Sequence, residues 1–155
     1  MEKEVIRFIV HAKKNTYADP NAKQTKLPNG RIQLDLKKGP FSYRDRFGIY
    51  FDKNKLEKFN GSEVIVKDGK RKWKMNYRGG MMSDDVTTKK TFAFLREAMS
   101  RVKEDRPFRG PEHFKKGKFE YVDKSKGTAD KFEGVEKVFY NGKLLHIVRY
   151  KGGKL

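Results

Sequence analysis

The sequence lacks cysteine altogether and has only three histidines and one tryptophan among its 155 residues. The absence of cysteine excludes a disulfide framework, thiolate chemistry and a cysteine-ligated zinc site. His11, His113 and His146 stand singly, without the spacing of metal ligands. Glycine-rich nucleotide loops and hydrolase nucleophile motifs are missing as well. We therefore expect no metal and no cofactor, and the sequence favours a protein that is not an enzyme.

Long hydrophobic runs are also missing. No apolar stretch reaches the length of a bilayer span, and the first ten residues are charged and amphipathic, unlike a signal peptide. Aromatic residues make up 13% of the chain, which is typical of a folded protein and not of a disordered one. We expect a soluble, cytoplasmic protein with no membrane partner, folded as a single domain over residues 1–155. The sequence does not indicate an oligomeric state.

Acidic residues are scarce relative to basic ones, with 20 Asp and Glu against 38 Lys and Arg and a net charge of +18. Such an excess attracts polyanions, so nucleic acid is a candidate partner. The excess is shared between residues 1–78 and 79–155 and does not form a basic tail. Solubility, or descent from a lysine-rich thermophilic proteome, explains the charge equally well.

Two segments have the periodicity of amphipathic helices. In residues 3–15 the apolar positions recur every three or four residues, beginning at Val5, and Asp19-Pro20 ends the pattern. Residues 86–103 show the same spacing in Phe92, Leu95, Met99 and Val102. We predict one helix in each segment.

Strand patterns surround these helices. Residues 32–36 alternate between apolar and polar side chains, and Asn29-Gly30 predicts a tight turn before them. Residues 63–66 and 72–77 flank Asp68-Gly69, a pair typical of a two-residue hairpin turn.

The pattern of the first part then recurs in the second. Residues 37–45 and 115–123 both read K-K-G-x-F-x-Y-x-D, and Asn141-Gly142 corresponds to Asp68-Gly69. We predict an α+β fold with two internally repeated helix-strand-hairpin halves, about 3–81 and 86–154. The halves would form an antiparallel sheet with the two helices packed on one face.

The candidate site follows from comparing the predicted halves. Asp45 and Glu63 recur as Asp123 and Glu136, which favours a structural role, whereas Arg44, Arg46 and Trp73 have no counterpart. An inward-facing Asp45 needs a partner, and a structural ion pair with an arginine would provide one. The main hypothesis is a module that binds a small molecule or an anion, with a regulatory role, at the interface of the halves. Its proposed ligand-binding residues are Tyr17, Tyr43, Arg44, Asp45, Arg46, Glu63, Trp73, Tyr77 and Arg109.

Two alternatives stay open. The first is a nucleic-acid-binding protein driven by charge, which requires a contiguous basic surface. The second is an enzyme that uses Asp45 and Glu63 as acid and base, which requires both carboxyl groups in one pocket.

Four stretches resemble a known family: residues 8–18, 41–46 (FSYRDR), 73–80 (WKMNYRGG) and 106–111 (RPFRGP). The resemblance is to a family of domains of unknown function, found in bacteria and archaea either alone or behind XRE-type helix-turn-helix domains in transcription regulators. It implies a stand-alone version of a domain that occupies the effector position of such regulators. It implies no catalytic residues.

Overall fold

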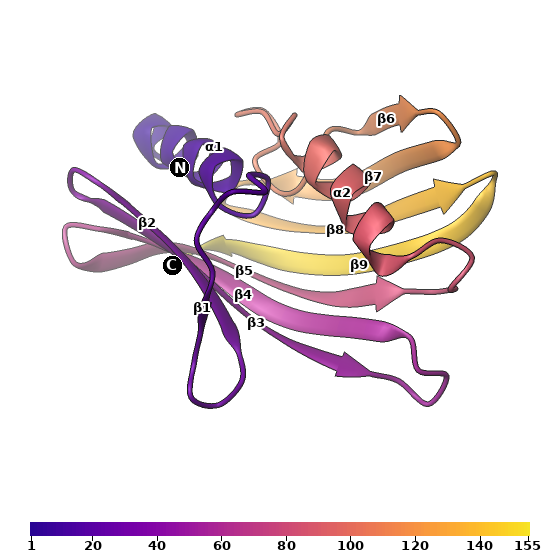
Figure 1. Cartoon of the computed structure of the whole chain (residues 1–155). Helices are drawn as coiled ribbons and strands as arrows, with labels where there is room; N and C mark the ends of the chain where they lie inside the picture. Colours follow the sequence, from indigo (N-terminus) through magenta and orange to yellow (C-terminus); the bar gives the residue numbers. More distant parts are fainter.

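A computed structural model describes residues 1–155 (Figure 1). Two helices, α1 (Lys3–Asn15) and α2 (Thr88–Met99), accompany nine strands. The strands form one antiparallel sheet in the order β1-β2-β3-β4-β5-β9-β8-β7-β6. They are β1 (Thr25–Lys26), β2 (Ile32–Lys38), β3 (Phe41–Phe51), β4 (Glu57–Lys67), β5 (Lys70–Met81), β6 (His113–Lys116), β7 (Phe119–Thr128), β8 (Lys131–Tyr140) and β9 (Lys143–Lys154).

The predicted fold class is wrong. The chain is largely β, with 52% of residues in strands and 16% in helices, in one continuous sheet instead of two helix-strand-hairpin halves. The strands extend well beyond the apolar stretches that predict them; the stretch 63–66 is part of the 11-residue β4. Their other positions carry lysine, arginine and glycine, which resemble loop residues when the pairing partner is unknown. The predicted second helix, residues 86–103, is confined to Thr88–Met99.

The hairpin turns and the first helix match their sequence signals. Asp68 and Gly69 have φ angles of 50° and 73°, and Asn141 and Gly142 have φ angles of 53° and 80°. Both central residues of a type I′ turn need positive φ, which asparagine, aspartate and glycine tolerate best. Helix α1 spans Lys3–Asn15 and buries the predicted apolar stripe.

The sheet has one covered side and one bare side. Figure 1 shows both helices on the same side of the sheet, of which they cover only a part. Helix α1 contacts β3 and β4, whereas α2 contacts β7. The core therefore has two hydrophobic clusters, one around Trp73 and Ile9 and the other around Leu95 and Tyr121. A cavity lies on this covered side, between the two helices.

At the centre of the sheet, where β5 contacts β9, we predict that Gly79 does not tolerate a larger side chain. Gly79 pairs with Val148, and a Cβ atom at Gly79 would lie 2.0 Å from the carbonyl oxygen of Ile147. We expect Gly79→Ala to lower the free energy of unfolding by about 3 kcal/mol, because the two strands must move apart. Gly69→Ala meets no neighbouring atom, and its positive φ should cost only about 1 kcal/mol. Urea unfolding of both variants checks this, and equal losses would contradict it.

Candidate functional site

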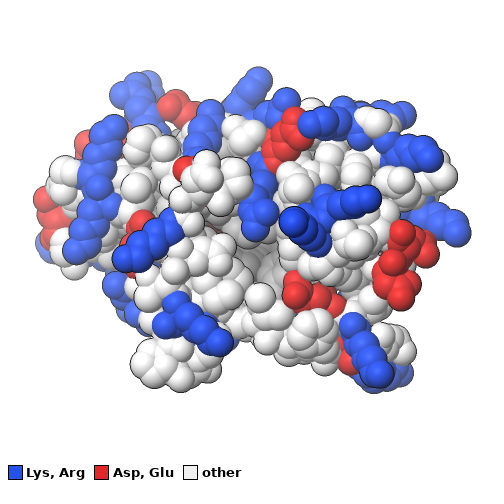
Figure 2. All heavy atoms as spheres, in the orientation of Figure 1, with Lys and Arg blue, Asp and Glu red and all other residues white.

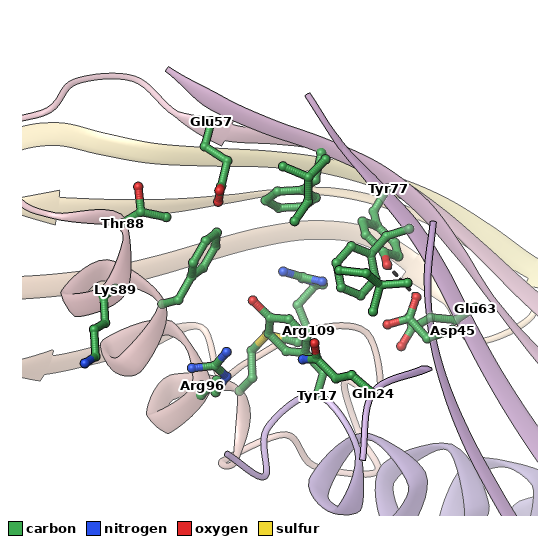
Figure 3. A pocket seen from close by; sticks show the side chains of 16 residues that line it. Tyr17, Gln24, Asp45, Glu57, Glu63, Tyr77, Thr88, Lys89, Arg96 and Arg109 are labelled. Carbon is green, nitrogen blue, oxygen red and sulfur yellow. Dashed lines mark hydrogen bonds between the residues drawn. The ribbon is translucent and has the colours of Figure 1, made fainter. Parts of the chain in front are cut away.

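A cavity of about 260 Å³ opens between the helices and the covered side of the sheet. Figure 2 shows a hollow near the middle of this face, with charged side chains around it. In Figure 3, Asp45, Glu63 and Tyr77 lie together at one end, whereas Glu57, Thr88 and Lys89 lie toward the other. The first three residues are buried, and Lys89 is exposed. The cavity is lined by Tyr17, Gln24, Ile32, Asp45, Phe47, Ile49, Glu57, Phe59, Glu63, Tyr77, Thr88, Lys89, Phe92, Arg96, Met99 and Arg109.

Asp45 is the acidic group at the inner end. Its side chain points to the covered side because Tyr43, Asp45 and Phe47 alternate along β3 with exposed arginines. The residue is only 2% exposed, and its carboxylate accepts one hydrogen bond, from the Tyr77 hydroxyl to Oδ1. Burial, reinforced by the neighbouring Glu63, raises the pKa of Asp45 to about 7. Asp45 can therefore gain or lose a proton near neutral pH.

Tyr77 reaches Asp45 across an intervening strand. Tyr77 belongs to β5 and Asp45 to β3, and Gly61 of β4 lies directly opposite Tyr77. A Cβ atom at Gly61 would lie 2.5 Å from the Tyr77 hydroxyl. Gly61 thus provides the space through which the tyrosine ring crosses β4.

Glu63 is the register partner of Asp45 on β4, and its environment differs. Lys13 of α1 donates to both oxygens of Glu63, over 2.9 and 2.7 Å, and the Tyr43 hydroxyl donates to Oε1. Lys13 is only 1% exposed, and burial lowers its pKa although the Glu63 charge opposes that shift. The ion pair neutralises Glu63 and leaves Asp45 without a cationic partner.

A second carboxylate pair, Asp123 and Glu136, lies on β7 and β8. Tyr150 donates to Asp123 over 2.7 Å across Gly134, and Tyr121 donates to Glu136 over 2.6 Å. Burial raises the pKa of Asp123 to about 7. The hydrogen bonds therefore follow the pattern of the first pair.

In the second pair, unlike the first, the loop between α2 and β6 fills the space beside the aspartate. Arg106 Nη2 of this loop lies 3.3 Å from Asp123 Oδ2. The ring of Phe108 stacks on Phe132, with centroids 4.2 Å apart, and lies beside Tyr150. Asp123 therefore faces an arginine and packed rings, whereas Asp45 faces a cavity.

Arg109 forms the wall between the two carboxylate pairs. Its Nε and Nη2 atoms donate to the two oxygens of Glu136 over 3.0 and 2.9 Å. Burial opposes ionisation of Glu136, but this arginine overcomes it and holds the pKa of that carboxyl below its usual value. The other side of the guanidinium faces the rings of Tyr17 and Tyr77, with Cζ 5.9 and 5.5 Å from their centroids. Burial around the Tyr17 phenol raises its pKa to about 12.

His146 lies behind Phe59 and Phe92, two aromatic residues that line the cavity. Its ring stacks on Phe59 and meets the edge of Phe92, and neither nitrogen has a hydrogen-bond partner. Burial lowers the pKa of His146 to about 4, so the imidazole is neutral at physiological pH. It adds no charge to the cavity.

The structure brings together five of the nine residues proposed from sequence. Tyr17, Asp45, Glu63, Tyr77 and Arg109 all line the cavity. Tyr43 lies behind Glu63 and holds its carboxylate.

The other three proposed residues lie elsewhere. Arg44 and Arg46 are on the opposite, bare side of the sheet, where they contact Asp35 and Gln33. The alternation of β3 that turns Asp45 inward turns both arginines outward, so the expected ion pair between Asp45 and an arginine does not form. Trp73 is fully buried in the core, stacked on Phe132.

Sequence reasoning missed the contribution of α2. Thr88, Phe92, Arg96 and Met99 follow one another at helical spacing and all line the cavity. The sequence interprets this stripe as core. Lys13 was also missed, although it follows Val5 and Ile9 at intervals of four and therefore shares their buried stripe.

Neither helix is long and apolar enough to cross a membrane. The residues also form no group of three or more His, Cys, Asp or Glu side chains that could hold a metal ion.

The fold and the cavity define a small, largely β domain with a buried carboxyl pair at the end of a pocket. The chain belongs to the family described as Domain of unknown function (DUF5680), whose model matches residues 48–155. The expected resemblance to a domain family of unknown function is thereby confirmed, without any evidence for a fused helix-turn-helix. Neither the curated proteins nor the solved structures contain a significant match.

The buried Asp45 predicts an unusual dependence of stability on pH. Its carboxyl has a pKa of about 7 in the folded protein against an ordinary value of 3.8, so the folded state holds a proton that the unfolded chain releases. The contribution of Asp45 to stability is therefore full below pH 4 and is lost as the pH rises to 7. Asp45→Asn removes this loss and can still accept from Tyr77. Its free energy of unfolding relative to wild type should increase by about 2 kcal/mol between pH 5 and pH 8.

Urea unfolding at the two pH values measures this change. Asp105→Asn, an exposed replacement of the same kind, is the control and should show no such trend. A constant difference between Asp45→Asn and wild type would contradict the assignment.

The Lys13–Glu63 ion pair predicts a strong coupling between helix and sheet. Lys13→Met leaves the Glu63 carboxylate buried without its cation and should lower the free energy of unfolding by about 3 to 5 kcal/mol. Adding Glu63→Gln removes the unpaired charge and should restore part of that loss. Chemical unfolding of the two single variants and the double variant measures the coupling, and strictly additive losses would show that the pair contributes nothing.

Proposed function

We propose that the protein binds a small organic molecule in the cavity through an amino or other cationic donor group placed at Asp45. The observation that carries this proposal is the unpaired state of Asp45. Lys13 pairs with Glu63 and Arg109 pairs with Glu136, whereas Asp45 accepts only from the Tyr77 hydroxyl. A buried carboxylate without a cation is costly, and a ligand cation would remove that cost.

The walls of the cavity support a cationic ligand with an apolar body. Tyr17, Phe47, Phe59, Tyr77 and Phe92 present aromatic rings. Ring faces attract cations, and they also bury apolar surface. The volume of about 260 Å³ lies just below the roughly 300 to 1,000 Å³ of typical ligand pockets, which suits a small molecule.

An anionic group of a ligand fits the mouth better than the inner end. Arg96 and Lys89 of α2 line the outer part of the cavity, and neither forms an ion pair with a carboxylate of the protein. The inner end carries the carboxyl group of Asp45, which repels anions when it is ionised, and Lys13 there is already paired with Glu63. A ligand with both signs of charge would therefore place its amino group inward and its acid at α2.

The regulatory part of the proposal rests on the family resemblance alone. In proteins where such a domain follows an XRE-type helix-turn-helix, it occupies the effector position. A ligand-sensing role of the cavity agrees with that arrangement.

A second candidate is proton transfer. Asp45 and Glu63 are register partners in one pocket, and only Glu63 is neutralised by a cation. A carboxyl with a pKa of about 7 matches the requirement for a general acid or base at neutral pH. In that case a substrate would still bind to an Asp45→Asn variant but would not be converted.

The cavity proposal predicts selectivity for amines. We expect 2-phenylethylamine to raise the melting temperature of the wild-type protein, whereas 3-phenylpropanoate and 2-phenylethanol, of similar shape, should have little effect. Binding favours ionised Asp45, so it should release a proton and strengthen between pH 6 and pH 8. Thermal-shift measurements give the first result, and calorimetry in buffers of different ionisation enthalpy gives the second.

Matched variants assign the effect to one carboxyl group. Asp45→Asn should abolish the stabilisation by the amine. Asp123→Asn changes the second carboxylate pair, where no cavity lies beside the aspartate, and should retain the stabilisation. If the carboxylate probe stabilises as well as the amine, or if Asp45→Asn responds like wild type, the proposal is wrong.

A further inference from the structure

The bare side of the sheet carries a broad hollow that is distinct from the cavity. The hollow has a volume of about 1330 Å³ and is lined from β4, β5, β9, β8 and β7. Both helices lie on the other side of the sheet (Figure 1). Seven lysines and arginines line the hollow against two glutamates. The surface is therefore strongly positive and uncovered.

The strand register aligns these charges. Arg78 of β5 lies directly opposite Arg149 of β9, which lies opposite Val135 of β8, and Val135 lies opposite Lys124 of β7. These residues form one line across four strands, roughly 14 Å long at the usual strand spacing. The neighbouring line runs through Asn76, Lys151, Glu133 and Lys126.

None of the lysines and arginines that line this surface forms an ion pair, although Glu120 and Glu133 lie among them. Arg78, Arg149, Lys124, Lys126, Lys137 and Lys151 take part in none of the ion pairs of the structure. Some basic residues elsewhere do form ion pairs, for example Arg44 with Asp35 and Lys116 with Glu97. Like charges placed directly opposite on adjacent strands destabilise a sheet. The facing Arg78 and Arg149 therefore carry a cost that a bound anion would remove.

We infer that this hollow binds the phosphate backbone of double-stranded nucleic acid. Closely spaced arginines and lysines with amide groups between them, such as Asn76, are typical of phosphate contacts. Among the lining residues Phe139 is the one aromatic side chain besides the inward-pointing Tyr77 and Tyr150, so the surface has no platform for stacking single-stranded bases. A flat anionic membrane does not fit a hollow, and the exposed large apolar residues Ile49, Tyr50, Phe51, Met82 and Leu155 all lie outside it. Binding should be independent of base sequence.

The test is a fluorescence-anisotropy titration of a 20-base-pair duplex at several salt concentrations. Wild type should bind at low salt, and the logarithm of its affinity should fall linearly with the logarithm of the salt concentration. Arg78→Gln with Arg149→Gln should weaken binding at least tenfold and reduce the salt slope by about 2, one for each lost phosphate contact. Lys14→Gln with Lys90→Gln removes the same charge from the exposed surfaces of α1 and α2, and should change affinity less than twofold.

A second pair, Lys124→Gln with Lys126→Gln, repeats the test at the other end of the line, so the result does not depend on one variant. Circular dichroism confirms that each variant is folded. The inference is overturned if wild type shows no complex at low salt, or if the helix-side control weakens binding as much as the sheet variants. It is also overturned if phosphatidylserine vesicles or polyglutamate bind in an Arg78- and Arg149-dependent way while the duplex does not.

Discussion

The burial of two facing carboxyl groups, Asp45 and Glu63, is the constraint on which the covered side of the sheet depends. They are register partners on adjacent strands and each is 2% exposed. Two carboxyl groups buried on directly opposite residues of adjacent strands cannot both remain ionised without compensation. The protein resolves this by giving Glu63 a buried lysine from α1, while Asp45 keeps one tyrosine hydroxyl and a raised pKa. The same lysine ties α1 to β4, so helix placement and carboxyl chemistry have a common cause.

The cavity next to Asp45 results from a local difference between the two carboxylate pairs. Both pairs place a tyrosine across a strand through a glycine, at Gly61 and at Gly134. Only the second pair has a loop that brings Arg106 against its aspartate and Phe108 against its tyrosine. The space next to Asp45 is left to the side chains of α2 and of the segment after α1, which line it without filling it. The position of the cavity therefore follows from what one loop covers.

Local features of the fold could be predicted from sequence, and features of the whole sheet could not. The first helix follows from its apolar stripe, and the two hairpin turns follow from Asp68-Gly69 and Asn141-Gly142, because each depends on neighbours along the chain. The pairing of β5 with β9 joins residues far apart in sequence, so the single nine-stranded sheet was not evident. Matching motifs in the sequence instead suggested two halves, each with its own helix, and the strand share of the fold was underestimated.

In the candidate site, too, local features could be predicted from the sequence, whereas features that depend on the whole sheet could not. Alternation along β3 was sufficient to turn Asp45 inward and, applied consistently, would have removed Arg44 and Arg46 from the site. The tyrosine that bonds Asp45 was named, but its reach across Gly61 depends on strand order. Phe92 and Arg96 were not recognised as residues that line a cavity. Helical periodicity shows which face of a helix points toward the protein, but it does not show whether that face meets other side chains or a cavity. Composition likewise gave the net charge without its distribution.

That distribution separates the two sides of the sheet. On the covered side every fully ionised buried group has a partner within the protein, as in Lys13 with Glu63 and Arg109 with Glu136. On the bare side Arg78 faces Arg149 without a carboxylate between them, in a chain that has 20 acidic residues available. Solubility alone would be served by dispersed charge and requires no such alignment across neighbouring strands. A line of unpaired cations across adjacent strands costs stability, and the gain that offsets such a cost is an anion from outside the protein. The two sides thus point to two partners of opposite charge, a small cation in the cavity and a polyanion on the sheet.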